Sequence, residues 1–397
     1  MLQRVGAAAM EVKGRNLVMV REYNEEKDKE AVEEMERQCE IGQQGKSTLV
    51  TDLMGDPMCR IRHSSLHIML VAEYGEEENI VGVVRGCVKT VTRGNSMYVK
   101  VAYLLGLRVS PQHRNLGAAT ELVKKVEEWS EQNGADYAYM ATDCSNHPSI
   151  HLFTTKCAYR KFRTPTLLVQ PVHAHRKRVD SAVAVVRLTP KLTESIYRRV
   201  FADSAEFFPK DIDNVLGSHH SLGSFMALPK KWLSKWDPDD VSVLPPSYAV
   251  LSVWSIKKVF RLQLKGASRM TRGFCAASRW VDSRLPWLKL PSVPDVFNKF
   301  WVYFLYGLHM EGSCASGLMK SLCSFVHNMG MDDDGCRAIV AEVGPRDPVR
   351  TVIPHWRKLS LEEDLWCLKK LGDDEPSDWT KSPSSNSSVV FVDPRDI

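Results

Sequence analysis

The chain has 397 residues, of which 44% are hydrophobic and 25% are charged, a composition typical of soluble globular proteins. This length predicts two or three domains. The 53 basic residues nearly balance the 48 acidic ones, which leaves a net charge of +5. Without a long basic run, this charge argues against direct nucleic-acid binding, and no apolar stretch is long enough to predict a membrane-spanning helix.

The ten cysteines stand singly along the chain, and none belongs to a CxxC pair. We therefore expect no metal site, because structural zinc ligands usually come in closely spaced pairs. Several cysteines lie inside apolar segments, which is typical of buried, reduced thiols and predicts a reducing compartment, the nucleus or the cytoplasm. Residues 1–16 lack the hydrophobic core of a secretory signal and are predicted to form a mobile tail.

The first predicted elements are a strand, a charged helix and a hairpin. Leu17 to Tyr23 has the β-branched content of a strand. Glu25 to Ile41 places its apolar residues on one face, which predicts a helix. Leu66 to Glu73 and Ile80 to Thr92 are apolar runs separated by the polar turn GEEEN, and together they predict an antiparallel hairpin.

A central strand and an amphipathic helix follow. Tyr98 to Ser110 is apolar on both faces, so we expect it in the middle of a sheet. Leu116 to Gln132 has helical periodicity. Its predicted apolar stripe consists of Leu116, Ala119, Leu122, Val123, Val126 and Trp129. Asp136 to Thr142 predicts another strand, Ser149 to Lys156 a short helix, and a further strand starts at Tyr159.

The second half of the chain repeats the first in weaker form. Tyr303 to Met310 (YFLYGLHM) mirrors Ala102 to Val109 (AYLLGLRV), with Gly307 in the place of Gly106. An apolar-striped segment follows in both halves, and AIVAEV then stands where YAYMAT stood. The same order at a spacing of about 200 residues predicts a degenerate tandem duplication.

The segment from Arg114 to Ala119 (RNLGAA) lies between the central strand and the amphipathic helix. The first turn of a helix carries unpaired N–H groups and a partial positive charge. Gly117 and the small residues after it leave room for a diphosphate to approach these groups, and Arg114 adds a cation. The pattern predicts an anion-binding loop made of Arg114, Asn115, Leu116, Gly117, Ala118 and Ala119.

This loop and its flanks, LGLRVSPQHRNLGAATELVKKVEEW, resemble the coenzyme A motif Q/R-x-x-G-x-G/A of the GCN5-related N-acetyltransferases. The resemblance implies acetyl-CoA as co-substrate. It also implies an α/β (α+β) fold with a mixed central sheet flanked by helices, in tandem here with a degenerate second copy. In that family the strand before the loop bulges and splays from its neighbour. The backbone groups that would pair with the pantetheine arm are those of Leu107, Arg108 and Val109.

A second motif of this family, N-x-x-A-x-x-L-Y-x-x-x-G-F, is similar to NHPSIHLFTTKCAY, and Asn146 matches its asparagine. Phe153 falls where the family often has a tyrosine that protonates the departing thiolate. Phenylalanine can pack against the cofactor but has no proton to donate. Asp143 and Glu73 are the candidate bases, and an exposed or ion-paired structural role is open for each.

Five further segments, REYNEEKD, TDLMGDPMCRIRHS, LSLEEDLWCLKKLGDD, DWTKSP and VFVDPRD, resemble the plant Hookless family of N-acetyltransferases. That resemblance spans nearly the whole chain and implies a role in differential growth where ethylene and auxin responses meet. We favour a protein lysine or N-terminal amine as the acceptor. The alternative is a regulatory scaffold that binds acetyl-CoA with weak or no catalysis, a reading favoured by Phe153 and by the lack of a loop arginine in the second copy.

The predicted organisation has four parts. They are a mobile tail at 1–16, an acetyl-CoA-binding domain at 17–188, a degenerate acetyltransferase-like domain at 189–372, and a C-terminal tail at 373–397 with a serine-rich spacer and a short strand.

Overall fold

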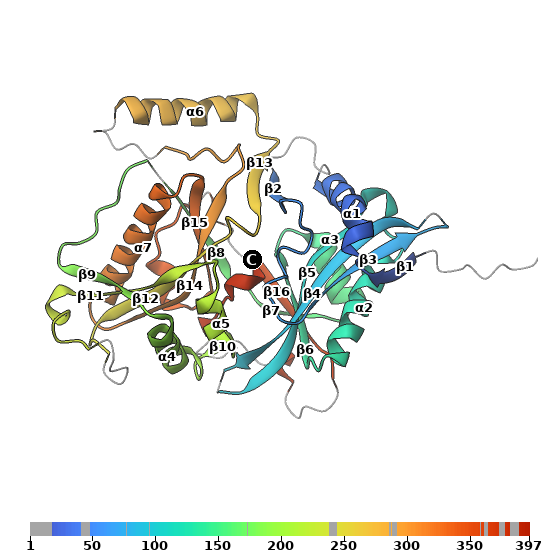
Figure 1. Ribbon diagram of the computed structural model, residues 1–397, viewed down its shortest axis with the longest axis horizontal. Helices are drawn as coiled ribbons and strands as arrows, with labels where there is room; N and C mark the ends of the chain where they lie inside the picture. Colours follow the sequence, from blue (N-terminus) through green and yellow to red (C-terminus); the bar gives the residue numbers. More distant parts are fainter. Residues whose placement is uncertain are drawn as a thin grey trace, which may run out of the picture.

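The computed structural model describes residues 18–397 except 41–47, 77, 95, 173, 238–243, 286, 288–291, 358, 361–363, 373–377 and 382–388. The predicted tail at 1–16 and the serine-rich spacer at 382–388 lie outside these residues. Two mixed sheets lie side by side, each flanked by helices, and strands from distant parts of the sequence meet between them (Figure 1). The predicted α/β (α+β) fold is confirmed.

The first sheet is built mainly from the N-terminal half. Its strands are β1 (Val18–Glu22), β3 (His67–Tyr74), β4 (Asn79–Arg93), β5 (Tyr98–Val109), β6 (Tyr137–Asp143), β7 (Arg160–Arg163), β10 (Ala205–Pro209), β16 (Asp364–Lys370) and β17 (Val389–Val390). They run in the order β1-β3-β4-β5-β6-β16-β7, with β10 beside β4 and β17 beside β10. Only β5 with β6 and β10 with β17 are parallel among these described strands.

Helices α1 (Glu25–Glu40) and α2 (Ala118–Gln132) cover opposite faces of this sheet. Val32 of α1 packs in the same core as Val83 of β4, whereas Leu122 of α2 packs with Val84. Successive side chains of a strand point to opposite faces, so the two helices cannot share one. α3 (His147–His151) continues into a π-helical turn at Leu152–Lys156.

The second sheet has the order β8-β15-β14-β12-β11-β9. Its strands are β8 (Thr166–Pro171), β9 (Val183–Leu188), β11 (Ser221–Pro229), β12 (Tyr248–Ser255), β14 (Trp301–Glu311) and β15 (Cys336–Val343). α7 (Ala315–Asp332) packs on one face with its buried Leu318 and Leu322. α4 (Pro190–Phe201) and α5 (Ile212–Gly217) contribute Tyr197 and Val215 to the core shared with the first sheet.

The predicted duplication is visible in the backbone of β5 and β14. Gly106 has φ +63° and Gly307 has φ +59°, a region that favours glycine because it has no Cβ. The register shifts at both glycines: Val84 of β4 faces two residues of β5, and Leu251 of β12 faces two residues of β14. The same bulge at the same place in two strands is the structural trace of a tandem copy.

The two sheets exchange strands. β16 lies between β6 and β7 of the first sheet, with Trp366 opposite Ala141. In return β8 lies beside β15 of the second sheet, with Val169 opposite Val340. Each sheet therefore takes strands from both predicted ranges, 17–188 and 189–372.

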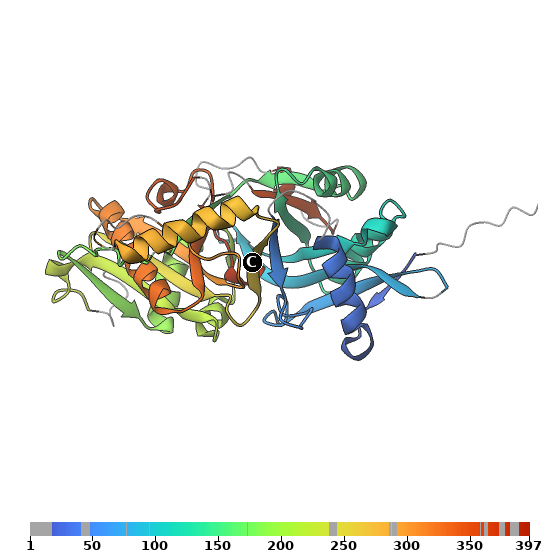
Figure 2. The same cartoon turned by 90° about the horizontal axis from the view of Figure 1, so that it is seen from above.

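A small two-stranded sheet also joins the halves. β2 (Thr48–Asp52) pairs with β13 (Arg261–Lys265) above the junction (Figure 1). α6 (Arg269–Arg284) follows β13 and lies across the outside of the second half (Figure 2). The connection brings α1, β2 and β13 together around one cleft, which is described below.

The segment after β17 is buried at the centre of the molecule. Lys89 of β4 lies 2.6 Å from both carboxylate oxygens of Asp396 and 3.3 Å from Asp393. The hydroxyl of Tyr139 donates to Asp396 at 2.7 Å, and Arg395 pairs with Asp393 at 2.7 Å. A charged network thus fills the interface between the halves, where an unpaired charge would cost several kcal/mol.

Candidate active site

The predicted site lies where β5 and β6 part. Their parallel pairing ends at Leu104 and Met140, while β5 continues to Val109. On its other side, β6 pairs with β16 along its whole length. Among the strands that the structure describes, none pairs with the β6-facing edge of β5 from Leu105 onward.

After the bulge, β5 has no partner on its β6 side among the described strands, although the Val109 carbonyl accepts from the Cys39 thiol at 3.5 Å. Leu107, Arg108 and Val109 follow the bulge glycine and are all partly exposed. An unpaired strand edge offers N–H and C=O groups that an extended amide chain can bind. The pantetheine arm of coenzyme A is such a chain, so the geometry fits the backbone contacts that the family resemblance implied.

The loop after β5 is open and ends at the first turn of α2. Asn115 has φ +65° and Gly117 has φ +89°. A Cβ placed on Gly117 would have no atom within 4 Å, so the space above the turn is empty. Arg114 is exposed, and Ala118 is the first helical residue. The free N–H groups of this turn and the empty space fit a diphosphate.

One detail of the prediction for α2 is wrong. The helix begins at Ala118 and not at Leu116, whose side chain is 46% exposed and does not extend the apolar stripe. The positive φ of Gly117 turns the chain before the helix starts. Leu116 therefore lies on the loop, and Ala118 takes its place among the buried residues.

Asn146 and Phe153 lie on the far side of the splay. The Asn146 side chain caps α3, accepting from the Ser149 N–H at 3.4 Å, and donates to the Thr142 hydroxyl at 3.1 Å. Phe153 is 2% exposed and packs edge-on against Tyr159, with ring centroids 5.1 Å apart. Its place in the core next to α2 is that of a packing residue.

The two candidate bases occupy different surroundings. Glu73 is buried in β3 and accepts from Arg21 at 2.7 Å, next to Asp28 of α1. These are the contacts of a structural ion pair. Asp143 ends β6 at the splay, where it accepts from the Ser145 N–H at 2.6 Å and faces Asp364 of β16. The structure therefore brings Asp143, but not Glu73, to the edge of the splay.

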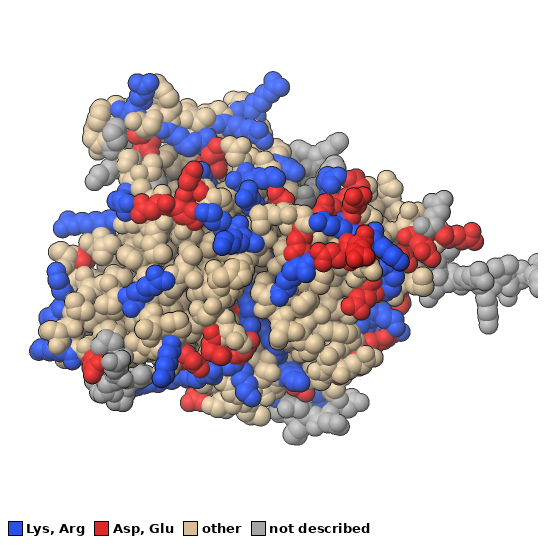
Figure 3. All heavy atoms as spheres, viewed as in Figure 1, with Lys and Arg blue, Asp and Glu red and all other residues tan. Residues whose placement is uncertain are grey.

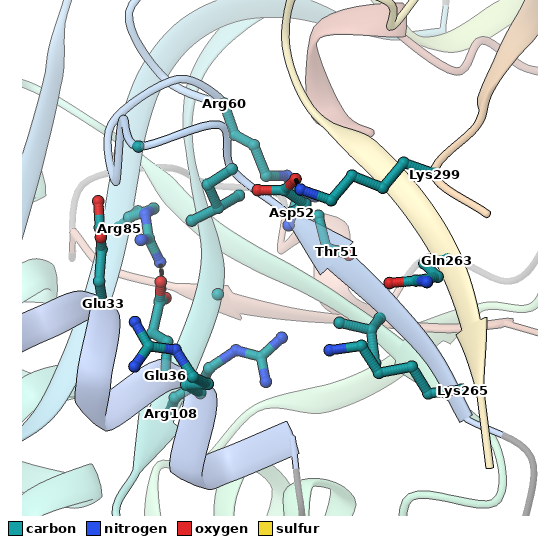
Figure 4. Close-up of a pocket in the computed structure, with 15 residues that line it drawn as sticks. Glu33, Glu36, Thr51, Asp52, Arg60, Arg85, Arg108, Gln263, Lys265 and Lys299 are labelled. Carbon is teal, nitrogen blue, oxygen red and sulfur yellow. Dashed lines mark ion pairs between the residues drawn. The ribbon is translucent and has the colours of Figure 1, made fainter. Parts of the chain in front are cut away.

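A cleft of about 310 Å³ lies on the α1 side of the bulge. Its floor includes Gly106 and Arg108 of β5, and its walls come from α1, β2 and β13 (Figure 4). Charged side chains dominate the lining: Glu33, Glu36, Arg37, Asp52, Arg60, Arg85, Arg108, Lys265 and Lys299. The cleft thus meets the splayed strand from the face opposite α2, which is where an acceptor could approach.

The second bulge has only a small cavity of about 20 Å³ beside it. A Cβ on Gly307 would lie 2.2 Å from the ring of Tyr197, which fills the place beside the bulge. The connection from β14 to α7 is also shorter than that from β5 to α2, spanning residues 312–314 instead of 110–117. A Cβ on Gly312 would lie 2.3 Å from the Pro246 carbonyl oxygen, so this turn is packed where the first is open.

Two charged residues of interest were missed by the sequence-based predictions. Arg85 lies inside the apolar run IVGVVRGCVKTVT, and Glu342 lies inside AIVAEV. A charged residue in a buried strand needs a partner. The single charge within each apolar run was therefore the signal that could have identified both positions. The structure gives Arg85 the carboxylate of Glu36 at 3.0 Å and gives Glu342 the indole N–H of Trp366 at 3.0 Å.

Glu342 makes the stability dependent on pH. Burial, and then the nearby Asp364, raises the pKa of Glu342 from 4.5 to about 8. The folded protein binds this proton more tightly than the unfolded chain, so the free energy of unfolding falls as the pH rises from 4.5 towards 8. Glu342→Gln removes this loss. We expect the variant to be more stable than wild type by roughly 2–3 kcal/mol at pH 9 and by much less at pH 5. Urea unfolding of wild type and variant at both pH values measures the difference in the free energy of unfolding. The same difference at pH 5 and pH 9 would contradict the assignment.

Among the described residues, no group of three or more His, Cys, Asp or Glu side chains is placed to hold a metal ion. No described helix is both long and apolar enough to cross a membrane.

Comparison with known proteins gives consistent matches. Residues 29–159 match the Acetyltransferase (GNAT) family. The Arabidopsis thaliana protein "Probable N-acetyltransferase HLS1" is 48% identical, with 96% of this chain and 100% of that protein covered. "Probable N-acetyltransferase HLS1-like" of the same plant is 47% identical over 96% of this chain and 99% of that protein. Saccharomyces cerevisiae N-myristoyltransferase with bound myristoyl-CoA has a TM-score of 0.51 at 9% identity, covering 90% of this chain and 83% of that one, a likeness of fold alone.

Proposed function

Because the chain belongs to the plant Hookless (HLS1) family of N-acetyltransferases, within the GNAT acetyltransferases, we propose that it transfers an acetyl group from acetyl-CoA to an amine. The observation that carries this proposal is the first bulge with its open loop. The splayed edge of Leu107 to Val109 and the empty space above Gly117 lie in sequence on one path from strand to helix. That path fits the pantetheine arm and the diphosphate of one coenzyme A molecule.

Apart from a base for the amine proton, the proposed chemistry needs little from side chains. The amine nitrogen attacks the thioester carbon, the bond to sulfur breaks and the attacking nitrogen gives up one proton, so that an amide and a coenzyme A thiolate form. A backbone N–H after the bulge, near Val109, would donate to the carbonyl oxygen as it gains charge. Holding both reactants in one place supplies several kcal/mol of the barrier reduction. Phe153 donates no proton, so the thiolate is protonated by solvent or leaves as the anion.

We propose Asp143 as the base that receives the amine proton. It ends β6 at the splay, whereas Glu73 is held by Arg21 under α1. Asp364, directly opposite, has a pKa raised to about 6 by burial and then by Asp143.

The proposal also covers the acceptor of the acetyl group and the biological role. We propose a protein lysine or N-terminal amine as acceptor, reached from the cleft on the α1 side, and action in the nucleus or cytoplasm. The resemblance to the Hookless family supports a role in differential growth under ethylene and auxin. A second candidate is a regulatory scaffold that binds acetyl-CoA without turnover, and Phe153 in the place of the usual acid favours it.

Release of free thiol from acetyl-CoA, measured with and without peptides that carry a lysine or a free N-terminus, tests the activity. We expect the peptides to raise the rate at least about tenfold over the acceptor-free blank, since positioning and backbone polarisation both act only when the amine is bound. Asp143→Asn should lower kcat about 100-fold with little change in KM for acetyl-CoA, the usual size of a base contribution. Tight binding of acetyl-CoA without peptide-dependent release would favour the scaffold.

A further inference from the structure

The cleft beside the first bulge carries an excess of positive charge. Six basic residues line it against three acidic ones. Two of those acids are already paired inside it, Glu36 with Arg85 at 3.0 Å and Asp52 with Lys299 at 2.5 Å (Figure 4). On this face of the molecule, Lys and Arg side chains gather at the middle, next to an acidic group over α1 (Figure 3). A cleft lined mainly by one sign of charge concentrates ligands of the opposite sign.

Arg85 has a donor left over. It is 2% exposed, the most deeply buried of the six basic residues that line the cleft. Its Nε donates to the Pro57 carbonyl at 2.6 Å and its Nη1 pairs with Glu36. Its Nη2 is buried and has no hydrogen-bond partner among the residues that the structure describes. A buried guanidinium N–H without an acceptor costs free energy that an incoming carboxylate oxygen would restore.

The guanidinium group that carries this donor lies at the bulge. A Cβ on Gly106 would be 2.8 Å from Arg85 Nη1, so the guanidinium packs against the backbone where β5 leaves β6. Arg108, two residues on, and Lys265 of β13 line the same space. An anion held by these groups would therefore sit next to the place where the splayed strand presents the acetyl group.

We propose that this cleft binds an acidic side chain of the acceptor, so that the preferred acceptor is a peptide or protein amine flanked by Asp or Glu. The inference rests on the proposed function, since it identifies the cleft as the acceptor side of the transferase site. Arg85 contacts the acidic group with its free Nη2, and Arg108 and Lys265 add attraction at longer range. A basic histone-like tail would be disfavoured by the same charges.

The test uses the full chain and three peptides of equal length, each with one lysine flanked by Glu, by Gln or by Arg. We expect kcat/KM to be at least about tenfold higher for the Glu peptide than for the Gln peptide at low salt, and lowest for the Arg peptide. Lys265→Gln, at an exposed position of the cleft, should reduce the Glu preference mainly through KM. Arg85→Gln should abolish it. Arg176→Gln removes the same charge from an exposed site next to Asp332 of α7 and should leave it unchanged.

Two outcomes would overturn the inference. One is equal kcat/KM for the three peptides with wild type. The other is a fall in kcat with Arg85→Gln that is the same for Glu and Gln peptides, which would make Arg85 a catalytic group. If no peptide is acetylated, the proposed function fails. Fluorescence anisotropy of a labelled Glu peptide then decides the cleft assignment on its own: binding weakened by Lys265→Gln supports it, and absence of binding contradicts it.

Discussion

Replacing Gly117 with glutamate is expected to weaken the binding of acetyl-CoA at least about 100-fold, or roughly 2.7 kcal/mol. Two effects add. The φ of +89° at Gly117 strains any residue with a Cβ, by about 1–2 kcal/mol. The new carboxylate would also stand in the empty space above the first turn of α2, where the diphosphate is proposed to bind. The carboxylate would repel the diphosphate, and it would take the N–H groups of the turn for itself.

Calorimetric titration with acetyl-CoA measures this effect, and the chain offers a matched control. Gly94 has φ +82°, and a Cβ placed on it would also have no atom within 4 Å, but it lies between β4 and β5 at the other end of the strands. Gly94→Glu therefore adds the same strain and the same charge away from the loop. We expect it to keep wild-type affinity. Equal affinity for Gly117→Glu and wild type would contradict the assignment of this loop as the diphosphate-binding site.

Lys89→Met is expected to destabilise the fold by about 3–5 kcal/mol, the usual result of removing one partner from a buried ionic network. The Lys89 side chain is 8% exposed and lies 2.6 Å from Asp396 and 3.3 Å from Asp393. Without it, Asp393 keeps Arg395, but Asp396 loses its ammonium partner. Burial raises the pKa of Asp396, so a proton can replace the lost cation in acid. The destabilisation should therefore shrink as the pH falls.

Urea unfolding of Lys89→Met and of Lys125→Met at pH 7.5 and pH 5 tests this prediction. Lys125 is exposed on α2 and pairs with Glu128 at 2.7 Å. A surface pair of this kind contributes little, so the control should unfold close to wild type at both pH values. Similar midpoints for the two variants would mean that the central network contributes no more to stability than a surface pair.

The loop and its flanking elements could be predicted because their signals are local. The apolar strand, the small residues of RNLGAA and the periodicity of the helix lie within about 35 consecutive residues, a span that pattern reading handles well. The start of α2 was misplaced because Leu116 fits the helical period, although the positive φ of Gly117 places it outside the helix. Periodicity does not report a single backbone dihedral.

What the sequence could not show is pairing between distant segments. Nothing local in Asp364–Lys370 indicates a place between β6 and β7, because any apolar strand can pair with any compatible edge. The role of Glu73 was left open for a similar reason, since its partner Arg21 is 52 residues away. The cleft itself needs β13, which comes from the other half of the chain.

The exchange of β16 also means that β6 is synthesised well before its partner strand. β6 ends at Asp143, and its partner β16 begins at Asp364. At 5–20 residues per second, a ribosome needs roughly 10–45 s to make the intervening chain. During that time the outer edge of β6 is exposed on the emerging first half, and open edges invite pairing with other chains. The partner strand that covers this edge in the folded protein is complete only once Lys370 has left the ribosome.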